Sequence, residues 1–227
     1  MDFNSCEYYI SENQCVQEKN AYIKRLIFAS RNGEAVKSMV AKGVCYRKNL
    51  GVSLVRLSEI ATMCEPNKEL ADRLWQSGGR EEMILAACLM PIGEFPYDLA
   101  MEWVAAIVQV EIAEIVSMKL FSKLPYAEQL AKVLLKLPSE IPFLVGLSIV
   151  VRIESTADDA FCQQVCKCLF TNHFDNVAIT HLRYTFLENL LFTKPHFRAQ
   201  IENLLCSVNF ENEQMRNFFM ELLPIRL

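Results

Sequence analysis

Two carboxylates interrupt an almost entirely apolar segment, VAAIVQVEIAEIVSMKLF, at residues 104–121. If the segment is one continuous helix, Glu111 and Glu114 lie about 60° apart on one face, among aliphatic side chains. A buried carboxylate costs free energy unless it is paired or hydrogen-bonded. The alternative is a helix that starts near Gln109 and Val110, because Glu111 then lies in a first turn, where the helix dipole favours an acid.

The nine cysteines are an odd number and occupy apolar helical positions, which indicates reduced core thiols of a cytoplasmic protein rather than a disulfide framework. The cluster CQQVCKC places Cys162 and Cys166 on one helix face, where they could bind a metal or simply pack. His173 is near, but no fourth ligand follows at a recognisable spacing. We therefore expect no metal and no cofactor.

Other signatures of enzymes are missing from the sequence. There is no glycine-rich phosphate loop, no nucleophile elbow and no paired-histidine metal motif. His173, His181 and His196 stand singly, which indicates surface or helix-end positions. No apolar run reaches the roughly 18 residues of a membrane span, and the acidic N-terminus does not resemble a secretory signal. We expect a cytoplasmic protein without a membrane partner.

Positive charge is concentrated in one window of an acidic chain. Residues 19–56 hold nine basic residues and one acid, which is a net charge of +8. Because the whole chain has a net charge of −4, the remaining residues together carry −12. This asymmetry favours a polyanion such as DNA as the partner, although solvated outer helix faces would give the same pattern. The candidate DNA contacts are Lys24, Arg25, Lys42, Arg47, Lys48 and Arg56.

The elements that must position these residues are helices, because apolar residues recur at spacings of three and four. Ser53 and Asn67 are placed to begin helices, Gly78 to end one, and Thr156 with Asp159 resembles a capping box. PFLVGLSIVVRI, at residues 142–153, is apolar on nearly all sides and predicts a central buried helix.

Roughly a dozen helices with short turns predict an all-α fold. We interpret it as a curved solenoid of antiparallel helix pairs, of the HEAT-like or ARM type, with a compact bundle as the alternative. We expect a single domain over residues 1–227, with residues 1–13 as a candidate disordered N-terminus.

One stretch carries a resemblance to a known family: NLGVSLVRLSEIATMCEPNKELADRLWQSGGREEMILAACLMP, residues 49–91. It resembles the AlkD-like DNA alkylation repair family, which is built of HEAT-like repeats, and Trp103 and SMKLFSKLPYA extend the match, which is specific over residues 30–130. The matching positions are Gly51, Val52, Ser53, Leu57, Ile60, Ala61, Leu70, Ala71, Leu74, Trp75, Arg80, Glu81, Ile84, Leu85 and Ala86.

The resemblance implies a DNA glycosylase scaffold that removes positively charged alkylated purines without drawing the base into a deep pocket. By the family's spacing, the aspartate that stabilises the sugar cation corresponds to Glu114, a tryptophan to Val110 and a phosphate-binding arginine to Leu144. A second tryptophan falls near Thr185, with Tyr184 adjacent.

A lone carboxylate stabilises an oxocarbenium-like centre electrostatically, so Glu114 remains a candidate catalyst. The competing interpretation is an acid left at a helix start or in a salt bridge. We therefore expect a protein that binds double-stranded DNA, with weak, altered or absent glycosylase activity on alkylated purines. The alternative is a non-catalytic helical scaffold that binds a protein partner or a DNA structure.

Overall fold

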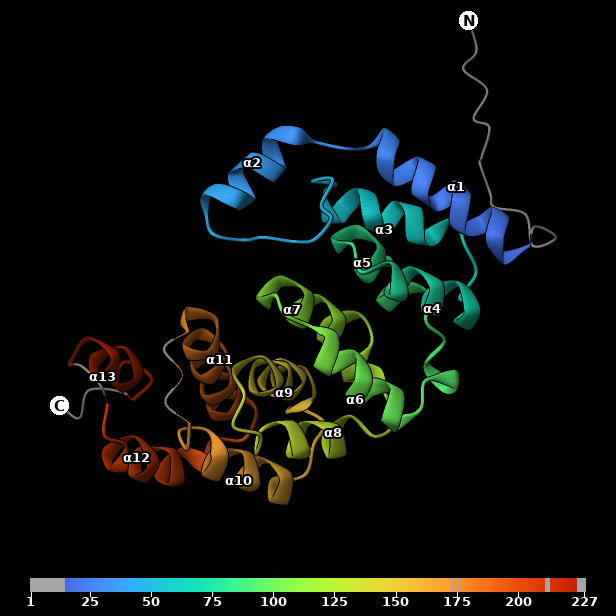
Figure 1. The fold of residues 1–227 in the computed structure, drawn as a ribbon. Helices are drawn as coiled ribbons and strands as arrows, with labels where there is room; N and C mark the ends of the chain where they lie inside the picture. Colours follow the sequence, from blue (N-terminus) through green and yellow to red (C-terminus); the bar gives the residue numbers. More distant parts are fainter. Residues whose placement is uncertain (1–14, 173, 175, 211–212, 224–227) are drawn as a thin grey trace, which may run out of the picture. The chain divides into compact units, whose positions relative to one another are not determined.

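The computed structural model describes residues 15–172, 174, 176–210 and 213–223. The N-terminal segment expected to be disordered, residues 1–13, lies outside the described residues. Every regular element in the described ranges is a helix (Figure 1). The chain divides into two compact units after Ala100, here called unit 1 and unit 2, and the division falls inside one helix. The single domain over residues 1–227 therefore stays a prediction.

The helices that begin in unit 1 are α1 (Val16–Ala29), α2 (Gly33–Ala41), α3 (Leu54–Thr62), α4 (Lys68–Ser77), α5 (Arg80–Leu89), the 3-10 turn η1 (Ile92–Glu94) and α6 (Tyr97–Ala106). Those of unit 2 are α7 (Val110–Lys119), η2 (Phe121–Lys123), α8 (Ala127–Leu134), α9 (Glu140–Ile153), α10 (Asp159–Cys168), α11 (Val177–Thr193), η3 (Pro195–Phe197), α12 (Arg198–Ser207) and α13 (Glu213–Met220).

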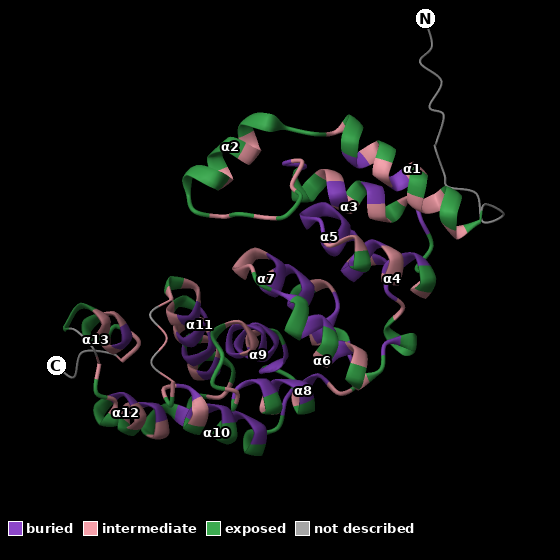
Figure 2. Ribbon diagram, viewed as in Figure 1, coloured by how far each residue is buried: buried purple, intermediate pink, exposed green. Residues whose placement is uncertain are grey.

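In unit 1, the most deeply buried helix is α5. It contacts α3 and α4, while α1 lies against α3 and α4. Nearly all of α5 is buried, including its charged first turn (Figure 2). Unit 1 is therefore built around a helix that begins with buried charges, and those charges need partners from neighbouring segments.

The predicted helix ends of unit 1 are confirmed. Ser53 Oγ accepts from the Arg56 amide at 3.2 Å, and Asn67 Oδ1 accepts from the Leu70 amide at 2.8 Å. Gly78 ends α4 in the left-handed conformation, with φ of 65°, which a residue without a Cβ adopts at no steric cost.

In unit 2, α9 is the central helix. It packs against α7 on one side and α11 on the other, and against α8 in a second row that continues to α10 (Figure 1). Residues 143–150 are buried without interruption, as Figure 2 shows, so the predicted central helix is confirmed. Two rows of helices are typical of a repeat array rather than of a bundle around one axis.

The segment at residues 104–121 is two helices and not one. α6 ends at Ala106 and α7 begins at Val110, with Gln109 as the residue that precedes it in extended conformation. Glu111 therefore lies in the first turn of α7, as the alternative interpretation predicted.

The capping box expected from Thr156 and Asp159 is wrong. Asp158 precedes α10 and its Oδ1 accepts from the Phe161 amide at 2.6 Å, whereas Thr156 Oγ1 donates back to the Ile153 carbonyl at 3.0 Å. A box with Thr156 as the cap would start the helix at residue 157, whereas α10 starts two residues later, at Asp159.

Candidate functional site

Glu114 and Val110 lie one turn apart on α7, and both are half-buried. The structure thus brings together the positions that correspond to the family's aspartate and tryptophan. It leaves an aliphatic side chain where the resemblance implies an aromatic ring beside the acid.

Arg152, near the end of α9, is the cation beside Glu114. Its guanidinium donates to Ser148 Oγ at 2.7 Å. Desolvation lowers the pKa of Arg152, and the attraction of the Glu114 carboxylate opposes that shift. The sequence reasoning missed this neighbour because it looked for cations on the same helix. The sequence held one indication of this neighbour: Arg152 is the only basic residue of α9, and Glu140 is its only acid.

The other family positions are not placed as a site around Glu114. Leu144 is fully buried in the core of unit 2. Tyr184 packs its ring on Phe218, with centroids 4.5 Å apart, and Thr185 Oγ1 donates to the His181 carbonyl at 2.9 Å. Both belong to α11, which α9 separates from α7 (Figure 1).

Four of the six candidate DNA contacts form no ion pair with any residue in the described ranges. They are Lys24 and Arg25 on α1, Lys42 at the end of α2 and Arg47 in the following loop. Arg25, Lys42 and Arg47 are exposed and Lys24 is half-buried. These four side chains, here called the unpaired cations, keep their charge available to a phosphate.

The remaining two candidates are engaged inside unit 1. Lys48 forms an ion pair with the buried carboxylate of Glu82. Arg56 pairs with Glu59 at 2.8 Å and its Nε donates to Ser30 Oγ at 3.2 Å. A phosphate would have to compete with these partners.

The turn at residues 49–53 is held from within the protein. Glu81 accepts from the amides of Leu50 and Val52, each at 3.2 Å, and Asn49 Oδ1 accepts from the Gly51 amide at 2.9 Å. Gly51 has φ of 71°, and a Cβ there would lie 2.2 Å from the Asn32 carbonyl oxygen. The amides of Leu50, Gly51 and Val52 thus donate to side chains of the protein itself.

Glu81 belongs to a buried charged cluster at the start of α5. Arg80 Nη1 lies 3.2 Å from Glu81 Oε1 and donates to the Val52 carbonyl at 2.9 Å. Glu82 is also fully buried and its Oε1 pairs with Lys48. Sequence reasoning did not identify this cluster, although three charges at the head of an otherwise apolar helix were a usable signal.

The thiols of CQQVCKC pack in the core. Cys162 and Cys166 are buried, and Cys162 Sγ lies 3.9 Å from the Glu154 carbonyl. Burial raises the pKa of Cys166 to about 12, which disfavours the thiolate that binds metals. Among the described residues, no three histidine, cysteine or acidic side chains gather as a metal site, and His173 lies outside them.

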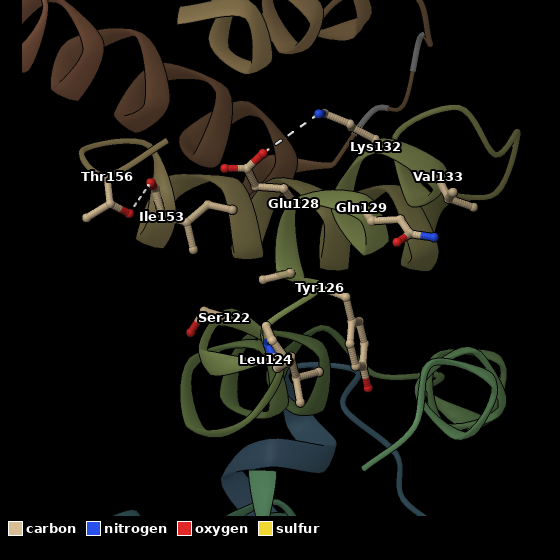
Figure 3. Close-up of a pocket in the computed structure, with 11 residues that line it drawn as sticks. Ser122, Leu124, Tyr126, Glu128, Gln129, Lys132, Val133, Ile153 and Thr156 are labelled. Carbon is tan, nitrogen blue, oxygen red and sulfur yellow. Dashed lines mark hydrogen bonds and ion pairs between the residues drawn. The ribbon is translucent and has the colours of Figure 1, made fainter. Parts of the chain in front are cut away.

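A surface hollow of about 630 Å³ lies between the start of α8 and the end of α9 (Figure 3). Two of its polar side chains have partners within the lining: Lys132 pairs with Glu128 at 3.7 Å, and Thr156 Oγ1 donates to the Ile153 carbonyl at 3.0 Å. The lining of the hollow includes none of the candidate catalytic or DNA-binding residues, and neither a histidine nor a cysteine. No described helix is long and apolar enough to cross a membrane.

Comparison with known proteins identifies the fold. No family model matches the sequence, and a search of curated proteins gives no match. One similar solved structure is described as belonging to "a new family of proteins related to the HEAT-like repeat DNA glycosylases with affinity for branched DNA structures". It aligns with a TM-score of 0.69 and 13% identity, over 88% of this chain and 92% of that one. The predicted all-α, HEAT-like repeat fold is confirmed.

Proposed function

We propose that this protein binds double-stranded and branched DNA through sequence-independent phosphate contacts. The observation that carries the proposal is the group of unpaired cations, Lys24, Arg25, Lys42 and Arg47, in a fold shared with a protein that has affinity for branched DNA. Cations without an internal partner gain most from a phosphate, because no existing ion pair is broken. We place this activity in the cytoplasm, where the thiols stay reduced.

We further propose that glycosylase activity on alkylated purines is weak, altered or absent. Glu114 retains a carboxylate, but Val110 supplies no aromatic wall and the buried Leu144 supplies no guanidinium. Arg152 beside Glu114 also neutralises part of the charge that would stabilise a sugar cation.

A non-catalytic scaffold that binds a DNA structure or a protein is the second candidate function. The bonded amides of Leu50, Gly51 and Val52 favour it, because backbone donors at the turn before α3 are then not available to a phosphate. A scaffold that binds a DNA structure shares the DNA contact with the first candidate and lacks its chemistry, whereas a scaffold that binds a protein shares neither.

The test of DNA binding is a titration of a fluorescent duplex with the full chain at several salt concentrations. If each of the four unpaired cations neutralises one phosphate, the logarithm of the association constant should fall against the logarithm of salt with a slope of about −4. Reversing Lys42 and Arg47 to Glu should make the slope shallower by about 2 and weaken binding to all duplex sequences alike.

The matched control reverses Lys136 and Lys167 to Glu, because these exposed lysines of unit 2 also form no ion pair with a described residue. The control changes the net charge equally and should leave the slope in place. Equal losses from both double variants would contradict a local contact. Absence of duplex binding at low salt, with salt-insensitive binding to a protein, would favour the protein scaffold.

A further inference from the structure

Phe28 is an aromatic ring that the fold leaves in solvent. It lies on the outer face of α1, with 57% of its surface exposed, whereas Ile23 and Ile27 of the same helix are buried. The spacing explains the difference, because position 28 points about 100° away from position 27 around the helix axis. The ring therefore contributes little to the core of unit 1.

Three cations lie near this ring in the chain, two on the second half of α1 and one just beyond its end. Lys24 and Arg25 precede Phe28 by four and three residues, which places them on the same helix face. The Arg31 guanidinium lies 4.3 Å from the ring centroid, and its Nη1 donates to the Phe28 carbonyl at 3.1 Å. No acidic residue occurs from residue 19 to residue 33.

We propose that Phe28 is a stacking platform for an unpaired DNA base at a branch or fork, with Lys24, Arg25 and Arg31 holding the adjoining phosphates. This proposal rests on the proposed DNA binding and adds what the protein recognises in the DNA, namely an unpaired base. Aromatic rings and guanidinium planes stack on bases of any sequence, while nearby cations follow the backbone. A fully paired duplex keeps its bases stacked inside the helix, so only an unpaired base reaches the ring.

The surroundings of Phe28 fit a nucleic acid better than a protein. An aromatic anchor of a protein interface lies among apolar contacts that exclude water. Here the ring is rimmed by Lys24, Arg25 and Arg31, none of which pairs with an acid in the described ranges. A fourth cation, Arg56, reaches the end of α1 through Ser30.

The experiment compares the affinity of the full chain for a forked DNA with its affinity for a fully paired duplex of the same length. The wild type should prefer the fork. Phe28→Ala should weaken binding to the fork by about 5-fold or more, because the loss of one base–aromatic contact costs at least about that factor in affinity. The same variant should leave binding to the duplex nearly unchanged. Because Phe28 is exposed, the variant should keep the helical circular dichroism of the wild type.

Two further variants separate stacking from general effects. Phe28→Trp should keep the preference for the fork, and the emission of its exposed indole should be quenched by the fork and not by the duplex. Phe192→Ala is the matched control, because Phe192 is 88% exposed on α11, in the other unit. It should change neither affinity.

The outcomes distinguish this inference from the proposed function. A wild type that binds both DNAs, with a fork preference that survives Phe28→Ala, would overturn the stacking platform and leave DNA binding in place. A wild type that binds neither DNA at low salt would overturn both. Loss of the fork preference in Phe28→Ala alone would support both.

Discussion

Glu114, which we propose as the remnant of a catalytic position, has a carboxylate but no aromatic ring at Val110 beside it. The Glu114 carboxylate attracts the Arg152 guanidinium of α9 electrostatically, while Val110 and Leu144 offer only aliphatic groups. Preorganised donors and charges act together in a site, so a single retained carboxylate preserves only a small part of the rate.

We predict that the wild type excises 7-methylguanine from a duplex at least about 100- to 1,000-fold more slowly than a full-site enzyme, since one lost electrostatic contact commonly costs that much. The measurement is single-turnover base release, with Glu114→Gln as the comparison. Excision at the full-site rate, abolished by Glu114→Gln, would establish Glu114 as a working catalyst.

Restoring the family residues is limited by burial. Leu144→Arg would place an unpaired charge in the core and destabilise the fold by several kcal/mol. Val110→Trp with Glu114→Asp avoids this cost, because both positions are half-buried. This pair is the informative reversion, and its gain in base release should be small without the arginine.

Sequence alone predicted three of the helix-end residues whose partners are local, although it missed the cap at Asp158. Ser53, Asn67 and Gly78 act within one turn of the chain, so their types and spacing were sufficient. The pairs Lys48 with Glu82 and Arg56 with Ser30 join positions 34 and 26 residues apart, and only the packing of α1, α3 and α5 brings them together. The spacing of residue types along the sequence does not reveal contacts between positions so far apart.

At the scale of elements, the start of α5 holds the turn at residues 49–53. Glu81 joins the buried Arg80 to the amides of Leu50 and Val52, so one side chain connects two segments. Removing it would take the Glu81 carboxylate away from the buried Arg80 and from the amides of Leu50 and Val52.

We predict that Glu81→Ala lowers the free energy of unfolding by about 3–5 kcal/mol, the usual cost of breaking a buried ion pair. Urea unfolding followed by circular dichroism measures the change. Glu69→Ala is the control: Glu69 is also the second residue of its helix, but its pair with Arg73 at 2.9 Å is exposed. That variant should lose about 1 kcal/mol or less, and equal losses would show that the buried cluster has no special role.

The boundaries of elements were less predictable than their existence. Spacings of three and four identified the helices, but no glycine or proline marks the break between α6 and α7 at residues 107–109. An apolar segment with helical spacing continues across that break. Tertiary packing therefore decides where α6 stops, and the apolar pattern of the sequence does not show that position.

At the scale of the whole molecule, the row of amphipathic helices predicted the repeat fold, and the similar solved structure confirms it. The division into two compact units had no such signal. It falls after Ala100, inside α6, where the composition does not change and no linker interrupts the chain. A solenoid is stabilised by neighbouring repeats, so its units need no separating linker.

The last prediction tests the single domain through buried thiols. Cys64 lies in unit 1 and Cys166 in unit 2, and burial raises their pKa values to about 11 and about 12. At pH 8 only about one thiol in a thousand or fewer is the reactive thiolate, and burial blocks the reagent as well. Both should therefore react with a thiol reagent only when the fold opens, while the exposed Cys15, Cys45 and Cys206 react at once.

If residues 1–227 unfold as one domain, Cys64 and Cys166 should become reactive at the same urea concentration, measured by mass spectrometry of the labelled peptides. The comparison is internal, because both thiols are in one chain and meet the same reagent. Different midpoints would show that the two units unfold separately and would overturn the single domain. Complete unfolding should make every cysteine reactive without reductant, since the eight described cysteines are free thiols.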